Sequence, residues 1–173
     1  MKLSESGKLF YQEYDLLLDA KFELDKYLND VIRKSKVILG EFIDLKRTET
    51  ACELELNEFS SDNEKGRVAI QVYVSSGNRS RVRGAVRIIY FDLRNNSHRS
   101  TNQVPAVIMV WSFNRDRNLI KELNRISNEV FGQNIYRKED LQLSMSSSED
   151  DAQIVAEAII RKHEQVMGIL NLL

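Results

Sequence analysis

The residues best suited to chemistry in this sequence are five arginines near the ends of predicted strands. They are Arg79, Arg81, Arg83, Arg115 and Arg117. Arginine binds carboxylate and phosphate groups through planar, bidentate hydrogen bonds. The first three are spaced by two residues, so their side chains share one side if the segment is extended. The pattern indicates an anion-binding site.

The charge distribution along the chain singles out the same region. Residues 67–125 contain 11 Lys and Arg against 3 Asp and Glu, and ten of the eleven basic residues are Arg. The flanks are acidic, with 10 against 15 in residues 1–66 and 4 against 8 in residues 126–173. A basic centre can bind a phosphate, a nucleotide, a nucleic acid or an acidic protein surface. The alternative is that the arginines pair with the acidic flanks of their own chain.

The hydrophobic periodicity predicts one α+β domain over residues 1–173, because helical and strand patterns occupy separate stretches. Short connections between the strands leave no room for crossover helices, so we expect an antiparallel meander of four to five strands. The predicted elements are a long helix at 8–39, strands at 52–57, 68–74, 85–93 and 104–113, a helix at about 115–131, one or two short strands within 134–146, and a helix at about 149–171.

The meander would position the arginines. Alternate loops of a meander lie at the same end of the sheet, so the loop at 75–84 lies where the fourth strand ends. The helix that begins at about 115 starts there too, with Asn114 as a candidate cap. Its unpaired backbone N–H groups also attract anions. We therefore expect the five arginines to gather at this end.

The first predicted helix has a wide apolar stripe that can face a protein core. Phe10, Tyr14, Leu17, Leu24 and Leu28 belong to a series in which most steps are of 3 or 4 residues. Lys21 and Ser35 interrupt the series, which favours a core-facing helix over a long coiled coil. The stripe is wide enough to pack on a second copy as well, so a homo-oligomer is one expectation. Ser6 is the candidate cap, and Gly40 is expected to end the helix.

Several function classes find no support in the motifs. The sequence has no GxGxxG, GxxxxGK[ST] or GxSxG pattern. His98 and His163 are interpreted as solvated, and Cys52 as a small core residue. We expect no bound cofactor and no metal site. Because no apolar leader or membrane-length apolar run is present, we expect a cytoplasmic protein without membrane contact.

One weak enzymatic alternative rests on an acid-x-Lys pattern. Asp44-Leu45-Lys46 has the form found in metal-dependent nucleases, where such residues hold Mg²⁺ and orient water. Glu53 and Glu55 also share one face of a predicted strand. Their spacing could serve a metal ion; the alternative is that this face is simply solvated. A degenerate nuclease is therefore kept as the second alternative.

The order of elements resembles the α+β scaffold of type III secretion chaperones and related small bacterial proteins, in which a first helix, an antiparallel sheet and a last helix bind protein segments. That resemblance implies a protein partner and assigns no residue. We therefore predict a non-enzymatic interaction module, either a protein-binding adaptor or a chaperone-like subunit. The alternative is an anion-binding module for nucleotide or nucleic acid that uses the arginine cluster.

Overall fold

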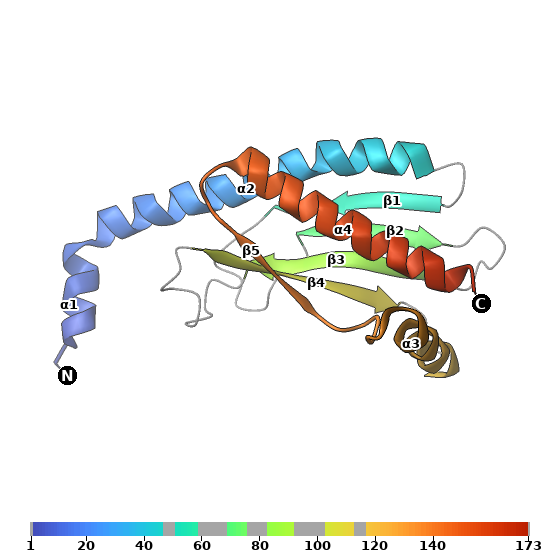
Figure 1. Cartoon of the computed structure of the whole chain (residues 1–173). Helices are drawn as coiled ribbons and strands as arrows, with labels where there is room; N and C mark the ends of the chain where they lie inside the picture. The colour runs from blue at the N-terminus through green and yellow to red at the C-terminus, as the bar shows by residue number, and fades with distance from the viewer. Residues whose placement is uncertain are drawn as a thin grey trace.

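The architecture combines helices with an antiparallel sheet (Figure 1). The computed structural model describes residues 2–46, 51–58, 69–75, 83–91, 103–112 and 117–172, without the side chains of 51–53, 74–75, 83–91, 111–112 and 119. The α+β class predicted from the sequence is confirmed. The elements are α1 (Glu5–Gln12), α2 (Tyr14–Lys46), β1 (Ala51–Leu56), β2 (Ile70–Ser75), β3 (Arg83–Phe91), β4 (Val104–Ser112), α3 (Arg117–Phe131), β5 (Glu139–Leu143) and α4 (Ser148–Leu170).

The described strands form one antiparallel sheet in the order β1-β2-β3-β4-β5. Because side chains alternate between the faces of a strand, the register decides which residues face the helices. Leu54 pairs with Val72, which puts both on the face that contributes to the core. Glu55 pairs with Gln71 on the opposite face. Figure 1 shows α2 and α4 over the core-forming face.

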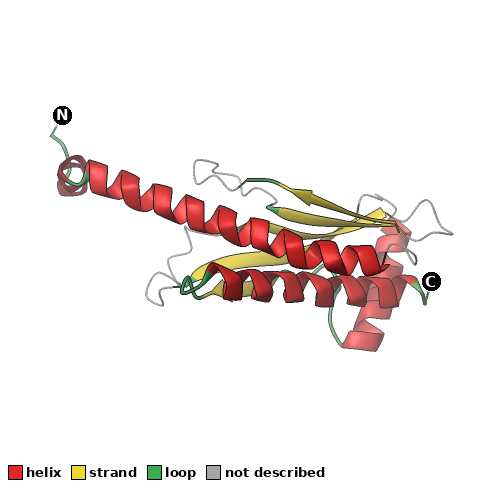
Figure 2. Ribbon diagram, turned by 90° about the horizontal axis from the view of Figure 1, so that it is seen from above, coloured by secondary structure: helices red, strands yellow, loops and turns green. Residues whose placement is uncertain are grey.

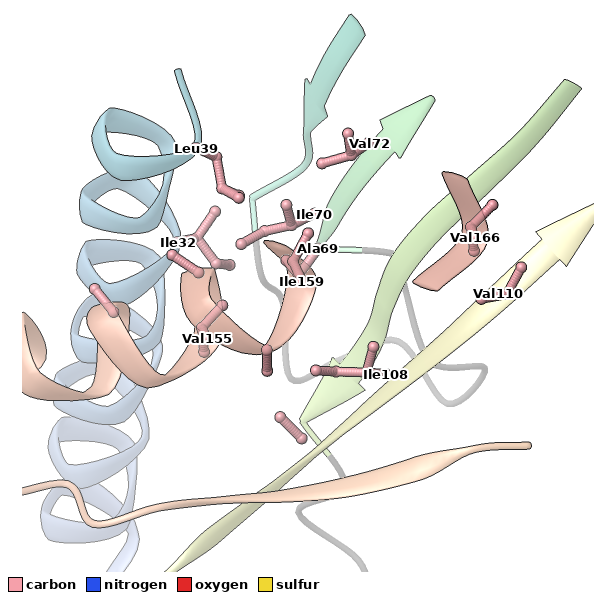
Figure 3. Packing of buried hydrophobic residues seen from close by; sticks show 14 of the residues in the cluster. Ile32, Leu39, Ala69, Ile70, Val72, Ile108, Val110, Val155, Ile159 and Val166 are labelled. Atoms are coloured by element: carbon pink, nitrogen blue, oxygen red, sulfur yellow. The ribbon is translucent and has the colours of Figure 1, made fainter. Parts of the chain in front are cut away.

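The hydrophobic core lies between this face and the two helices (Figure 3). Burying a large aliphatic side chain contributes roughly 1.5–3 kcal/mol, so this layer supplies most of the driving force for folding. The core includes Ile32 and Leu39 of α2, Val155, Ile159 and Val166 of α4, Ile70 and Val72 of β2, and Ile108 and Val110 of β4.

The prediction of one helix at 8–39 was wrong at both ends and in its continuity. The cap is Ser4, not Ser6, because the Ser4 hydroxyl accepts the Gly7 N–H at 3.1 Å. The chain turns at Glu13, which separates α1 from α2. The helix also continues past Gly40.

The extension beyond Gly40 has a packing explanation. Glycine in a helix interior costs about 1 kcal/mol relative to alanine. Ile43 is buried and Phe42 packs against the core, so the added turns gain apolar burial that outweighs this cost.

The C-terminal end of α3 and the start of α4 agree with the predicted bounds of about 131 and 149. Gly132 has a positive φ of 66°, and its N–H donates to the Asn128 carbonyl at 3.0 Å, which ends α3. Ser147 caps α4 by accepting the Asp150 N–H, and three acidic residues follow in the first turn. Their charges complement the positive end of the helix dipole.

The described helices give no indication of membrane insertion. None of them contains a stretch that is both long and apolar enough to span a bilayer.

Candidate functional site

The predicted arginine cluster lies mostly outside the described part of the chain. Arg79, Arg81 and Arg115 are not among the described residues, and only the backbone of Arg83 is described, at the start of β3. Arg117 begins α3 with an exposed side chain. The convergence of the five guanidinium groups, and the cap at Asn114, therefore stay predictions.

The backbone register bears on one part of that prediction. Gly84, next to Arg83, pairs with Ser112 at the last position of β4. The start of β3 therefore lies beside the end of β4, from which the chain leads into α3. This places two arginine-bearing segments at one end of the sheet at the level of the backbone.

The acid-x-Lys pattern does not have the strand geometry that a nuclease of that type needs. Asp44, Leu45 and Lys46 form the last turn of α2. The Glu55 carboxylate accepts hydrogen bonds from the Gln71 amide at 3.1 Å and the Tyr73 hydroxyl at 2.7 Å. Among the described residues, no cluster of three or more His, Cys, Asp or Glu side chains could hold a metal ion.

The interpretation of His163 as a solvated side chain was wrong. His163 is 2% exposed, and its ring makes an edge contact with Phe42 of α2 at 5.3 Å. Burial lowers the pKa of His163 to about 4, and the positive charge of Lys46 adds to this effect. The helix α4 is covered by the sheet and by α2, so its buried surface is wider than a single stripe. His98 and the side chain of Cys52 lie outside the description.

A buried ion pair joins α4 to β5. Lys162 is 1% exposed, and its ammonium donates to the Glu139 carboxylate at 2.5 Å. Glu139 pairs with Ile108 in the register, so it lies on the core face of the sheet. Arg161 approaches the other carboxylate oxygen at 3.7 Å. Each charge has a partner in the fold, which indicates a structural role.

Asp151 is the centre of a second buried polar cluster. Its side chain is fully buried and accepts hydrogen bonds from the Tyr27 hydroxyl at 2.7 Å and the Met145 N–H at 2.9 Å. Ser144 donates through its N–H at 3.0 Å and its hydroxyl at 3.2 Å. Burial, and then the bond to Asp151, raise the pKa of Tyr27. The cluster fixes the turn before α4, where Met145 has a positive φ of 59°.

A surface network extends this connection between α2 and α4. The Lys34 ammonium donates to Asp30 at 2.7 Å, to the Ser148 hydroxyl at 2.5 Å and to Glu149. The hydrogen bonds from Lys34 and Ser148 lower the pKa of the Asp30 carboxyl. The beginning of α4 is thus attached to α2 between Tyr27 and Ser35.

Beyond this attachment, α1 and the start of α2 project as a helical arm, defined here as α1 together with Tyr14–Leu24. Figures 1 and 2 show the arm extending past the sheet and α4, with α1 at its tip. No residue of α1 is buried, and the first buried residue of α2 is Leu28. The arm nevertheless exposes large apolar side chains, between 45% and 82% each: Leu9, Phe10, Tyr11, Tyr14, Leu16, Leu17, Leu18 and Phe22.

The exposed side chains of α2 in the arm have a clear arrangement. Tyr14 and Leu17 lie on the same side of the helix as the buried Leu28, because they precede it by 14 and 11 residues, about four and three turns. Leu18 and Phe22 widen this side, and the four residues are called the arm stripe. Asp19 and Glu23 lie away from Tyr14 and Leu17, whereas Asp15 precedes Phe22 by seven residues and lies at the edge of the stripe.

An aromatic contact spans the bend between α1 and α2. The rings of Phe10 and Tyr14 make an edge-to-face contact across the turn, with centroids 5.5 Å apart. A helix with a wide apolar side that no other described segment of the chain covers is suited to binding another macromolecule.

Comparison with protein-family models, with curated proteins and with solved structures finds no match for the chain. The resemblance to secretion chaperones therefore gains no support from them.

Proposed function

We propose that the chain is a non-enzymatic protein-interaction module and that the helical arm is its docking element. The observation that carries the proposal is the exposure of the arm stripe. Tyr14, Leu17, Leu18 and Phe22 are 45–69% exposed, whereas apolar residues further along the same helix, such as Leu28, Val31 and Leu39, are fully buried. Aromatic anchors on a projecting helix are typical of surfaces that dock into a partner.

The described polar clusters support a binding role over a catalytic one. Asp151, Lys162 and Lys34 each contact groups that connect α4 to a neighbouring element. A catalytic acid or base needs a proton-transfer partner at an accessible site. These groups instead connect secondary-structure elements to one another. The arm is therefore the most distinctive surface among the described residues.

Photo-crosslinking from the arm tests the proposal in the full chain. A benzophenone side chain at Leu18 should form an adduct with a protein, whether a copy of the chain or another protein from its host. Val37 is the matched control, because it is also on α2 and is 64% exposed. It lies in the body half of α2, residues 28–46, which packs against the rest of the fold; the body is this half together with the sheet, α3 and α4. The proposal predicts adducts from position 18 that exceed those from position 37. Equal yields at both positions, or none, would contradict it.

The anion-binding alternative keeps one structural argument, the adjacency of the β3 start and the β4 end near Arg117. A nucleotide or nucleic acid bound there should dissociate steeply as salt rises, because phosphate contacts by arginine release counterions. Arg81→Ala and Arg83→Ala should weaken the binding of a fluorescent oligonucleotide at low salt. No measurable affinity at low salt would remove this alternative.

The cytoplasmic location also stays a prediction.

A further inference from the structure

We propose that the arm stripe binds the arm stripe of a second copy, with the two helices antiparallel. This inference rests on the proposed function, since it names the partner of the same docking element. The stripe of Tyr14, Leu17, Leu18 and Phe22 would be covered reciprocally by one contact. A two-fold contact of this kind closes the assembly at a dimer.

The position of the body selects the antiparallel arrangement. The arm stripe lies on the side of α2 that the sheet and α4 cover further along, where Leu28, Val31 and Leu39 are buried. Two copies joined in parallel by this side would bring both bodies to the same place. Antiparallel arms leave the bodies at opposite ends, consistent with the projection of the arm beyond α4 in Figure 2.

The charged residue within the stripe favours the same arrangement. Lys21 lies four residues after Leu17 on this side of the helix. In a parallel pair it would face Lys21 of the second copy, and like charges there repel. In an antiparallel pair centred on Leu17 and Leu18 it lies beside Tyr14 of the second copy. There its aliphatic stem can pack on the ring while the ammonium stays near solvent.

The acidic side of the arm is compatible with this dimer and not with a lipid surface. Asp15 lies at the edge of the stripe beside Phe22, whereas Asp19 and Glu23 point away from Tyr14 and Leu17 and lie on the outside of the pair. The distance between the acidic residues of one copy and those of the other then approaches or exceeds the ~8 Å Debye length of physiological salt, so salt screens the repulsion between the copies. An interfacial helix on anionic lipid would carry Lys and Arg on its polar side instead.

The apolar area of the arm matches the lower range of specific interfaces. Phe10 of α1, whose ring contacts Tyr14, adds to the stripe at the tip. An aromatic side chain buries 150–250 Å², so at about half exposure each of these large side chains offers roughly 100 Å². Both arms together offer roughly 1,000 Å², the size of small, transient protein interfaces. We therefore expect a reversible dimer with a dissociation constant in the micromolar range.

Sedimentation equilibrium of the full chain tests the dimer. The mass should rise from the 20.1 kDa of one chain toward twice that value as concentration increases. The double substitution Leu17→Ser and Phe22→Ser should weaken the association about 100-fold, since two anchor side chains are lost. The matched control Val37→Ser with Leu45→Ser alters two exposed residues of the body half of α2 and should leave it unchanged.

A monomer at every concentration would overturn the dimer. If photo-crosslinking from position 18 still captured a different protein, the proposed function would survive that result. If it captured none, both would fail. Equal weakening by the control pair would also overturn the assignment to the arm stripe.

Cysteine crosslinking tests the antiparallel arrangement in a Cys52→Ser background. Leu18→Cys lies near the two-fold axis and should form a disulfide with its counterpart. Tyr14→Cys should not pair with itself, but should pair with Lys21→Cys when the two variants are mixed. Self-crosslinking at 14 and 21 without the mixed product would indicate parallel helices and would overturn the arrangement.

Discussion

The two halves of α2 have the same apolar pattern and opposite environments. Leu28, Val31 and Leu39 in the body half are fully buried, whereas Tyr14, Leu17 and Phe22 in the arm are 45–69% exposed. The difference arises where α4 begins, because Ser147 caps it near the middle of α2 and leaves the preceding turns of α2 uncovered. An apolar stripe thus indicates that one side of a helix is suited to packing against another surface. It does not indicate whether that surface belongs to the same chain or to another molecule.

The boundary between the two halves is a polar joint. Tyr27 donates to the buried Asp151, and Ser35 donates to the Ala152 carbonyl at 3.2 Å. Buried hydrogen-bonded groups cost free energy when their partners are lost, so they fix the relative position of α2 and α4. The arm begins where these contacts end.

The largest expected difference between the halves is in unfolding stability. Leu28→Ala should lower the free energy of unfolding by about 2–5 kcal/mol, because it opens a cavity in the core. Leu17→Ala removes an exposed side chain and should change that free energy by less than about 0.5 kcal/mol. Urea unfolding at a concentration where the chain is monomeric measures both. Similar losses would show that the arm packs on its own chain.

The joint should be the next most sensitive feature. In Asp151→Asn the introduced amide must face the N–H of Ser144 or of Met145, since each carboxylate oxygen accepts from one of them. We expect a loss of about 2–3 kcal/mol, the cost of a buried donor without an acceptor. Asp150→Asn, at the exposed neighbouring position, is the control and should cost at most about 1 kcal/mol of helix-dipole interaction. Equal effects of the two substitutions would show that the buried hydrogen bonds of Asp151 do not stabilise the joint between α2 and α4.

His163 should make the body half sensitive to acid. Its pKa in the folded chain is about 4, below the ordinary histidine value of ~6.5. The unfolded state therefore gains a proton first as pH falls, and the stability held by the neutral ring above pH ~6.5 declines toward pH 4. Between pH 7 and pH 5 this amounts to about 2 kcal/mol. His163→Leu should flatten the pH dependence of urea unfolding by that amount, and an unchanged slope would contradict the burial of the ring.

The sequence was sufficient for the class of the fold and for many element positions. The alternation of Ile70 and Val72 with Gln71 indicated a strand with one apolar face, and these residues form part of β2. Such patterns are local, so a single sequence contains them. Gly132 likewise ends α3, in agreement with the predicted end at about residue 131, because only the local backbone conformation is involved.

The misplaced features depend on contacts between distant segments. His163 is flanked by charged residues in sequence, and only the packing of α2 against α4 buries it. Gly40 is a strong local stop signal, yet the core contacts of Ile43 extend the helix beyond it. The alternation of Glu139, Leu141 and Leu143 places Glu139 on the core face of its strand, which could have revealed it as the buried partner of Lys162. The position of the start of α4 along α2 could not be derived from local sequence.

The most direct test of the account is hydrogen exchange along α2 at two protein concentrations. In the dilute monomer, amides of residues 14–24 should exchange through local fraying, while those of residues 28–43 should approach the protection of global unfolding. Raising the concentration should slow exchange in the arm and leave the body half unchanged. Equal protection of both halves in the dilute sample, independent of concentration, would show that the chain covers its own arm and would contradict the account.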